Sequence, residues 1–369
     1  MQIICSKAEL LKGVQTVQAA VSTKSTLPVL SNILLETKTN QLKLASTDLQ
    51  VGVRCLINAE IVKEGALTVP AKTFGDFIRT LPDDKEIEIN ASESSRIEIK
   101  CGKTRCVLLG LPKEEFPVFP EFQDDRAISI EVKALQEMIK KTHFAVSTDE
   151  TRYILNGIYF ILEKGIARMI ATDGRRLCYI ARPVKEKTVS ISAIIPSKAL
   201  VEVERLLSAD SKLPETIKIS ITENQVAFKL GETVIISRLI EGHFPNYEQV
   251  IPKSSDIRVL VSTRDLLTMT QRAALGSGER GGAVRFALDK GRLRAIGSAQ
   301  GRVEVEDELP VDFSGKPMEI AFNPGFMVDV LKNMDTSQVV IEFTTSLNPG
   351  VIRPEGDDQM ICVIMPMRT

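Results

Sequence analysis

Few side chains in this sequence stand at spacings that could do chemistry. The two histidines, His143 and His243, are far apart, and neither has a second histidine at the spacing of a zinc site. We therefore expect no metal or other cofactor and interpret both as ordinary helix or linker residues. The six cysteines include no Cys-x-x-Cys pair, and most stand in apolar, strand-like runs. That pattern is typical of buried thiols in a reducing compartment and predicts a cytoplasmic protein.

Phosphate-binding and acid–base chemistry find little support either. One stretch is rich in glycine, but no Lys-Ser/Thr follows it and no strand leads directly into it, so it is interpreted as a flexible turn; it contains Gly276, Gly278, Gly281 and Gly282. Asp48 and Asp173 recur at matching places and could act as paired carboxylates, but an Asp before a turn more often accepts hydrogen bonds from local backbone. Gln300 stands near that place in the third repeat, which weakens a shared acid role.

The elements that would position any site are repeated three times along the chain. Lys72 and Lys198 stand 126 positions apart within similar segments, and a third such segment follows; the three are Thr68–Pro82, Ala193–Leu207 and Ile320–Met334. A repeat of this length is the size of a whole domain rather than of a solenoid unit. The repeat predicts three equivalent domains, residues 1–125, 126–255 and 256–369, as in part of a ring or another symmetric assembly.

Each repeat has the same order of helix and strand patterns. A short strand leads into a helix, marked in the first repeat by Leu10, Val14 and Val17 on one face. Alternating strands follow, then a second amphipathic helix that carries Phe74 and Ile78, then three more strands. Strand runs interrupted by two helices predict an α+β fold with helices layered on antiparallel sheet. The first two repeats end in linkers that share a Phe-Pro step.

The distribution of charge gives a weak indication of contact with phosphates. The chain has a formal net charge of -1, with 43% hydrophobic and 26% charged residues, which are ordinary values for a globular protein. The expected helices nevertheless carry twelve cationic and eight anionic side chains. Such a layer could face phosphates without reading bases, or be a solvated face of mixed charge. The N-terminus has no signal-peptide pattern, and no apolar run is long enough for a membrane span.

Several motifs together resemble the bacterial sliding clamp, the β subunit of the replicative DNA polymerase III. They are TLPVLSNILLE (Thr26–Glu36), TDL (Thr47–Leu49), TVPAK (Thr68–Lys72), RYILNG (Arg152–Gly157), ATDGRRL (Ala171–Leu177), FPNY (Phe244–Tyr247) and MPMR (Met365–Arg368). The resemblance covers the whole chain. It implies clamp domains of two helices and antiparallel sheet each, and a head-to-tail homodimer that forms a ring around duplex DNA. It also implies a processivity factor for DNA replication, without a catalytic site, that tethers the polymerase catalytic subunit.

The resemblance assigns residues to DNA and to partner proteins. DNA contacts fall on Lys24, Lys72 and Tyr153, with departures from the family pattern at Asp149 and Ile154; Lys198 repeats Lys72. Partners are the clamp loader, the polymerase, and other polymerases and repair proteins that carry a short linear motif. Their pocket falls on Leu155, Thr172, Gly174, Arg175, Arg176, Leu177, Pro245, Val250, Leu347, Val363, Met365, Pro366 and Met367. At its rim, Gln249 stands where family members can have a basic residue, and Thr369 replaces an apolar C-terminal residue. An alternative for Met365 and Met367 is a place in an edge-strand core.

The implied dimer joins the edge of the first repeat to the third. It maps to Lys103, Arg105, Cys106 and Leu108 against Leu275, Glu304 and Asp307. Opposite charges on the two edges favour head-to-tail pairing, with Arg105 facing Glu304 and Lys103 facing Asp307. Two other classes of function stay open from the sequence: an enzyme with a site between repeats, and an interaction scaffold that never encircles DNA.

Overall fold

The chain forms two compact units in a computed structural model that describes residues 1–22, 26–92, 95–209, 214–278, 282–299 and 303–368. The first unit consists of Met1–Lys133 and Lys198–Leu239, and the second of Ala134–Ser197 and Ile240–Thr369. The units follow shared sheets rather than the sequence repeat, because the central repeat contributes strands to both. The domain boundaries near residues 125 and 255 therefore stay a prediction.

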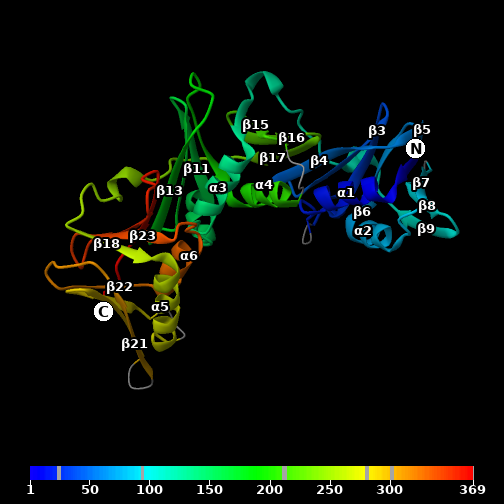
Figure 1. Cartoon of the computed structure of the whole chain (residues 1–369). Helices are drawn as coiled ribbons and strands as arrows, with labels where there is room; N and C mark the ends of the chain where they lie inside the picture. Colours follow the sequence, from blue (N-terminus) through cyan, green and yellow to red (C-terminus); the bar gives the residue numbers. More distant parts are fainter. Residues whose placement is uncertain (23–25, 93–94, 210–213, 279–281, 300–302, 369) are drawn as a thin grey trace. The chain divides into compact units, whose positions relative to one another are not determined.

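The first unit contains two antiparallel sheets. The smaller has the strand order β5 (Glu60–Lys63), β1 (Gln2–Ser6), β7 (Glu86–Ala91), β8 (Arg96–Cys101), β9 (Thr104–Leu109). The larger has the order β10 (Ile128–Glu131), β15 (Thr216–Ile221), β16 (Gln225–Leu230), β17 (Thr233–Arg238), β4 (Val51–Asn58), β3 (Gln41–Thr47), β2 (Asn32–Lys38), β6 (Ala66–Pro70). The helices are α1 (Lys7–Gln18), α2 (Ala71–Thr80) and most of α4 (Ser197–Ala209). Helices α1 and α2 pack side by side, and α1 also packs on β3 and β4 (Figure 1).

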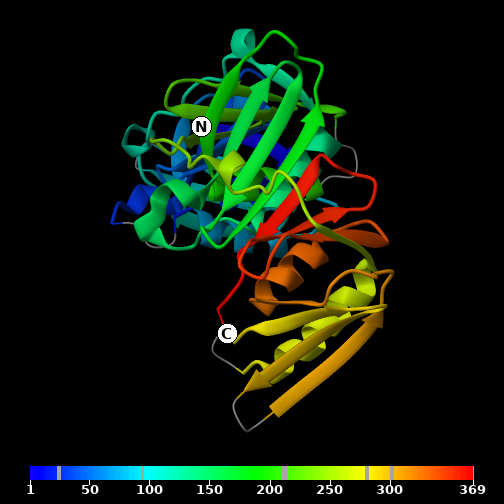
Figure 2. The ribbon, with the colours of Figure 1, turned by 90° about the vertical axis from the view of Figure 1, so that its left-hand side faces the viewer.

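The second unit also contains two antiparallel sheets. Its larger sheet has the order β14 (Ile191–Pro196), β11 (Gly157–Glu163), β12 (Ile166–Thr172), β13 (Arg176–Pro183), β25 (Met360–Ile364), β24 (Gly350–Pro354), β23 (Gln338–Phe343), β18 (Ile257–Ser262). Its smaller sheet has the order β21 (Val303–Pro310), β20 (Arg292–Ala299), β19 (Val284–Asp289), β22 (Met318–Phe322). The helices are most of α3 (Val132–His143), α5 (Thr263–Gly276) and α6 (Pro324–Lys332). Figure 2 shows the green strands of the larger sheet beside red β25.

The two eight-stranded sheets correspond strand for strand. In each, a strand that ends one repeat pairs with a strand of the preceding repeat: β17 pairs with β4, and β25 pairs with β13. We call these pairings the first and the second junction. Two strands that correspond to their halves, β9 and β21, stand at the edges of the two smaller sheets. The α+β class of helices on antiparallel sheet is thereby confirmed.

The helices form where the apolar periodicity predicts them. Ser6 caps α1, since its hydroxyl accepts a hydrogen bond from the Glu9 backbone N–H at 3.2 Å. Leu10, Val14 and Val17 are fully buried. The corresponding faces of α2 bury Phe74 and Ile78, and α2 starts directly after a proline.

The histidines and the glycine-rich stretch, which the sequence offered as candidates for a chemical site, lie in ordinary positions. His143 is the last residue of α3 and His243 is exposed in a loop. In the glycine-rich stretch, Gly276 ends α5 and Gly278 has a φ of +78°, whereas Gly281 lies outside the described residues. Within the described parts of the chain, no group of three or more His, Cys, Asp or Glu side chains is placed to hold a metal, and no helix has the length and apolarity to cross a membrane.

Candidate partner groove and strand edges

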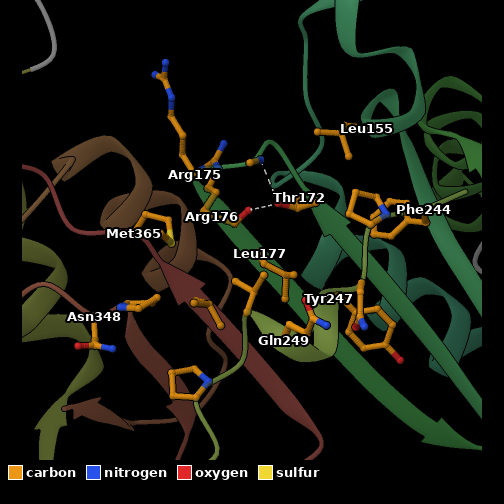
Figure 3. A pocket seen from close by; sticks show the side chains of 17 residues that line it. Leu155, Thr172, Arg175, Arg176, Leu177, Phe244, Tyr247, Gln249, Asn348 and Met365 are labelled. Atoms are coloured by element: carbon orange, nitrogen blue, oxygen red, sulfur yellow. Dashed lines mark hydrogen bonds between the residues drawn. The ribbon is translucent and has the colours of Figure 1, made fainter. Parts of the chain in front are cut away.

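A groove of about 470 Å³ lies over the second junction, and we call it the second-junction groove. Strand β13 and its preceding turn form one wall, β25 and the C-terminal residues form another, and the linker after Ile240 closes the third side (Figure 3). The lining residues are Leu155, Thr172, Gly174, Arg175, Arg176, Leu177, Phe244, Pro245, Asn246, Tyr247, Gln249, Val250, Pro252, Asn348, Pro349, Val363 and Met365. Most of these surfaces are apolar, which suits an extended peptide with apolar side chains.

The turn between β12 and β13 is fixed by its own side chains. The Thr172 hydroxyl donates to the Arg176 carbonyl at 2.6 Å and accepts from the Gly174 N–H at 3.0 Å. The Asp173 carboxylate accepts from the backbone N–H groups of Arg175 and Arg176 at 2.9 and 3.0 Å. Gly174 has a φ of +84°, a conformation that glycine adopts without strain. The prediction that Asp173 binds local backbone is confirmed.

The floor of the groove is the junction itself. Leu177 and Val363 are paired across the strands and are 2% and 1% exposed. The linker packs beside them through two stacked aromatic pairs. The ring centroids of Phe244 and Tyr159 are 5.0 Å apart, and those of Tyr247 and Tyr179 are 6.0 Å apart. Burial raises the pKa of the Tyr247 hydroxyl, so it stays a neutral group there. Figure 3 shows Leu177 between the turn and the linker.

The two arginines of the turn do different things. The Arg176 side chain is only 10% exposed; its guanidinium pairs with Asp173 at 3.0 Å and with Asp329 of α6 at 2.6 Å. It also lies 4.6 Å from the ring centroid of Phe326. Arg175 is exposed and extends away from the turn (Figure 3). Arg176 therefore holds α6 against the turn, and Arg175 is the cation available to a ligand.

Ten of the thirteen residues predicted for the partner pocket line this groove. Leu347, Pro366 and Met367 do not line it: Leu347 is 78% exposed, and the Met367 N–H donates to the Ala321 carbonyl at 2.8 Å. Sequence reasoning placed Gln249 at the rim, and it is among the lining residues. It missed Phe244, Asn246, Tyr247, Pro252, Asn348 and Pro349. The shared Phe-Pro step of the linkers was the available signal for the first three.

The residues predicted to contact DNA are dispersed over the chain, and Lys24 lies outside the described residues. Lys72 is exposed on α2, and Tyr153 is 57% exposed in the 3₁₀ helix Glu150–Asn156. Ile154 is half-buried. Asp149 caps that 3₁₀ helix by accepting a hydrogen bond from the Thr151 N–H at 3.0 Å.

Lys198 is already paired within the chain. Its ammonium donates to the Asp48 carboxylate, which also accepts from the backbone N–H groups of Gln50 and Val51 at 2.9 and 2.8 Å. Burial would raise the pKa of Asp48, but these hydrogen bonds outweigh it and lower that pKa. Asp48 therefore binds local backbone as predicted and partly neutralises Lys198. A contact of Lys198 with phosphate has to compete with that ion pair.

Five of the seven residues predicted for the dimer lie on the edge strands β9 and β21. Lys103 is in the turn before β9, and Arg105, Cys106 and Leu108 are on that edge strand; Leu275 is in the last turn of α5, and Glu304 and Asp307 are on β21. Within one chain Arg105 pairs with Glu98 of β8, and Asp307 pairs with Arg272 at 2.5 Å. Leu275 is 75% exposed. Sequence reasoning missed Leu109, which is 73% exposed at the end of β9.

Comparisons with known proteins give a consistent result over the whole chain. Family models of the DNA polymerase III beta subunit match residues 1–120 (N-terminal domain), 129–246 (central domain) and 248–368 (C-terminal domain). A beta sliding clamp of Pseudomonas putida is 33% identical over 371 residues, and one of Chlamydia pneumoniae is 31% identical over 369 residues. Each match covers 100% of this chain, and 100% and 99% of those relatives.

Solved structures agree with the sequence relatives. A sliding clamp from Pseudomonas aeruginosa bound to griselimycin has a TM-score of 0.94 at 32% identity, with 100% of both chains covered. A DNA polymerase sliding clamp from Bacillus subtilis has a TM-score of 0.95 at 28% identity and covers 100% of this chain and 99% of that one.

Proposed function

Because the chain belongs to the DNA polymerase III beta subunit family, we propose that it is a DNA sliding clamp that encircles duplex DNA and tethers the replicative polymerase. It acts without a catalytic site of its own, in the cytoplasm, as a head-to-tail homodimer of two three-domain chains. The domains have boundaries near residues 125 and 255. Other polymerases, repair proteins and the clamp loader use the second-junction groove through a short linear motif.

One observation carries the ring. The chain contains two complete junctions, β4 with β17 and β13 with β25, and two unmatched halves, β9 and β21. Strand β9 corresponds to β17 and β25, and β21 corresponds to β4 and β13. A second copy supplies the missing half on both sides, so pairing β9 of one protomer with β21 of the other repeats the same junction. Two different edges make the contact heterologous, and two protomers close it into a ring.

The complete junctions also set the register of the missing one. Because Ile235 pairs with Val53 and Cys362 with Cys178, the equivalent residues Cys106 and Val305 face each other. In the proposed register, counting along both strands, Leu108 is opposite Val303, and Arg105 is opposite Glu306 with Glu304 diagonal to it. Asp307 falls on the other face of β21, where Arg272 already holds it.

A charge reversal tests this dimer. Arg105→Glu places like charges across the strands and should weaken the dimer, and Glu306→Arg in the same chain should restore part of the loss. Exposed ion pairs contribute about 0–1 kcal/mol each, so apolar and backbone contacts carry most of the affinity. Glu319→Arg on β22, the opposite edge of the same sheet, is the matched control. Light scattering over a concentration series reads the result; additive single and double variants would reject the register.

Retention on DNA tests the clamp itself. The excess of cations on the helices is small, so static binding to phosphates is weak and a closed ring is needed for long retention. The protein loaded on nicked circular DNA should survive moderate salt and be lost when the circle is cut. Lys72→Ala should lower loading or salt tolerance, whereas Lys198→Ala should have the smaller effect because Asp48 already pairs with it. Equal retention on the linear product would favour an interaction scaffold that does not encircle DNA.

A further inference from the structure

The turn that shapes the second-junction groove has a twin at the first junction. The Thr47 hydroxyl donates to the Val51 carbonyl at 3.1 Å and accepts from the Leu49 N–H at 3.0 Å, as Thr172 does in the second unit. Leu49 has a φ of +75°, close to the value at Gly174. The backbone of the groove wall is thus built twice.

The strands and linkers around the two turns correspond as well. The Arg238 N–H donates to the Gln50 carbonyl, as the Met365 N–H does to the Arg175 carbonyl. A pocket lies over the first junction at the matching place, but its volume is only about 150 Å³. We call it the first-junction pocket; it is lined by Thr47, Leu49, Gln50, Gly52, Pro117, Val118, Phe119, Pro120, Gln225, Ile236, Ser237 and Arg238.

One aromatic side chain, Phe119, takes up space above the first junction. Gly52 pairs with Ile236, so it stands where Leu177 stands opposite Val363. A Cβ atom on Gly52 would lie 2.7 Å from Cε2 of Phe119, well inside van der Waals contact. The Phe119 ring therefore rests directly on the bare backbone of β4. It occupies the space above the junction that is open in the second unit.

Two sets of contacts hold the ring there. The Arg54 guanidinium lies 5.8 Å from the centre of the Phe119 ring and pairs with Glu121 at 2.9 Å. The ring also packs against the buried cluster that contains Phe116 and Leu34. In the second unit the residue at the place of Phe119 is Tyr247, which stacks on Tyr179 and lines the open groove together with Leu177.

We propose that Phe119 is a built-in occupant of a second copy of the partner groove, and that it restricts each chain to one partner peptide. The first linker presents this apolar ring as a bound peptide would present its anchor. Removing the ring opens a latent site for the same ligand class, a short extended peptide with one or two apolar side chains. The inference rests on the proposed function of the second-junction groove.

The test counts peptides per chain. Isothermal titration of a short peptide with leucine and phenylalanine anchors should give one equivalent for the wild type and two for Phe119→Ala. The second site should be about tenfold weaker or more, because it lacks the leucine floor. Phe119→Leu keeps an apolar plug and is the matched control, with one equivalent expected.

A second route opens the same pocket without truncating the ring. Gly52→Ala puts a methyl group into the ring's position and should displace Phe119; the strand backbone tolerates alanine because Gly52 is not at a positive φ. A photoreactive anchor on the peptide then locates each site. It should label the segment of Leu177 and Val363 in every variant, and that of Gly52 and Ile236 only in the opened ones.

The outcomes separate the two proposals. Two equivalents on the wild type, or one equivalent on both opened variants with native thermal unfolding, would overturn the role of Phe119. A wild type that fails to bind the peptide, or is labelled far from Leu177, would instead refute the proposed function of the second-junction groove.

Discussion

Met365→Ala gives the sharpest test of the second-junction groove. Met365 lines the groove and is 40% exposed in the free chain. Complete burial of a methionine side chain contributes about 1.5–3 kcal/mol, so about two fifths of that, roughly 0.6–1.2 kcal/mol, is gained when a peptide covers it. Truncation should therefore raise the peptide Kd by about three- to eightfold. Leu177→Ala is less clean, because Leu177 is 2% exposed and its truncation costs about 2–5 kcal/mol of stability.

Fluorescence polarisation with a labelled peptide measures the change. The Met365 backbone N–H donates to the Arg175 carbonyl at 2.9 Å, and this bond does not need the side chain, so the strand and the thermal unfolding should be unaffected. Met367→Ala is the control, since Met367 lies two residues on but does not line the groove. Equal losses in the two variants, or no loss in Met365→Ala, would refute the assignment of this groove.

Three further results are expected. Hydrogen bonds from Lys141 lower the pKa of Asp335, so its stabilisation is complete above about pH 4 and is lost as pH falls through the lower folded value. Solvent screens the largely exposed Asp335 carboxylate, so Asp335→Asn should cost only about 0.5–1 kcal/mol at pH 7, and melts of variant and wild type should converge in strong acid. A thiol reagent should label Cys106 first, as the other cysteines are buried, and mass spectrometry should find that labelling suppressed in the dimer. Arg176→Lys cannot keep all three guanidinium contacts, which are with Asp173, Asp329 and the Phe144 carbonyl, and denaturant unfolding should show a loss of about 1–3 kcal/mol.

Much of the fold was predictable because it repeats. Periodic apolar residues such as Leu10, Val14 and Phe74 point inward in the structure as the helical spacing indicates. Asp48 and Asp173 also behave as turn chemistry predicts, since their hydrogen bonds are local and need no knowledge of tertiary contacts. Local and periodic features were readable for that reason.

The features that sequence reasoning missed depend on contacts distant in the chain. Arg176 lines the groove as predicted, but its ion pair with Asp329, 153 positions away, was not readable, and that pair holds the guanidinium. The sequence also did not reveal that the two linkers pack differently on their junctions. They follow from one small residue, Gly52, beneath Phe119, a contact that the Phe-Pro step does not reveal.

The unmatched edges of β9 and β21 have a consequence for the protein when it is not in a ring. Each edge presents a row of backbone groups with which another strand can pair. The two edges differ in charge, so β9 of one protomer pairs with β21 of another more readily than with a second β9. Whether such additions stop at two depends only on the angle between successive copies. A substitution that changes this angle while leaving both edges intact would convert closed pairs into open-ended fibres.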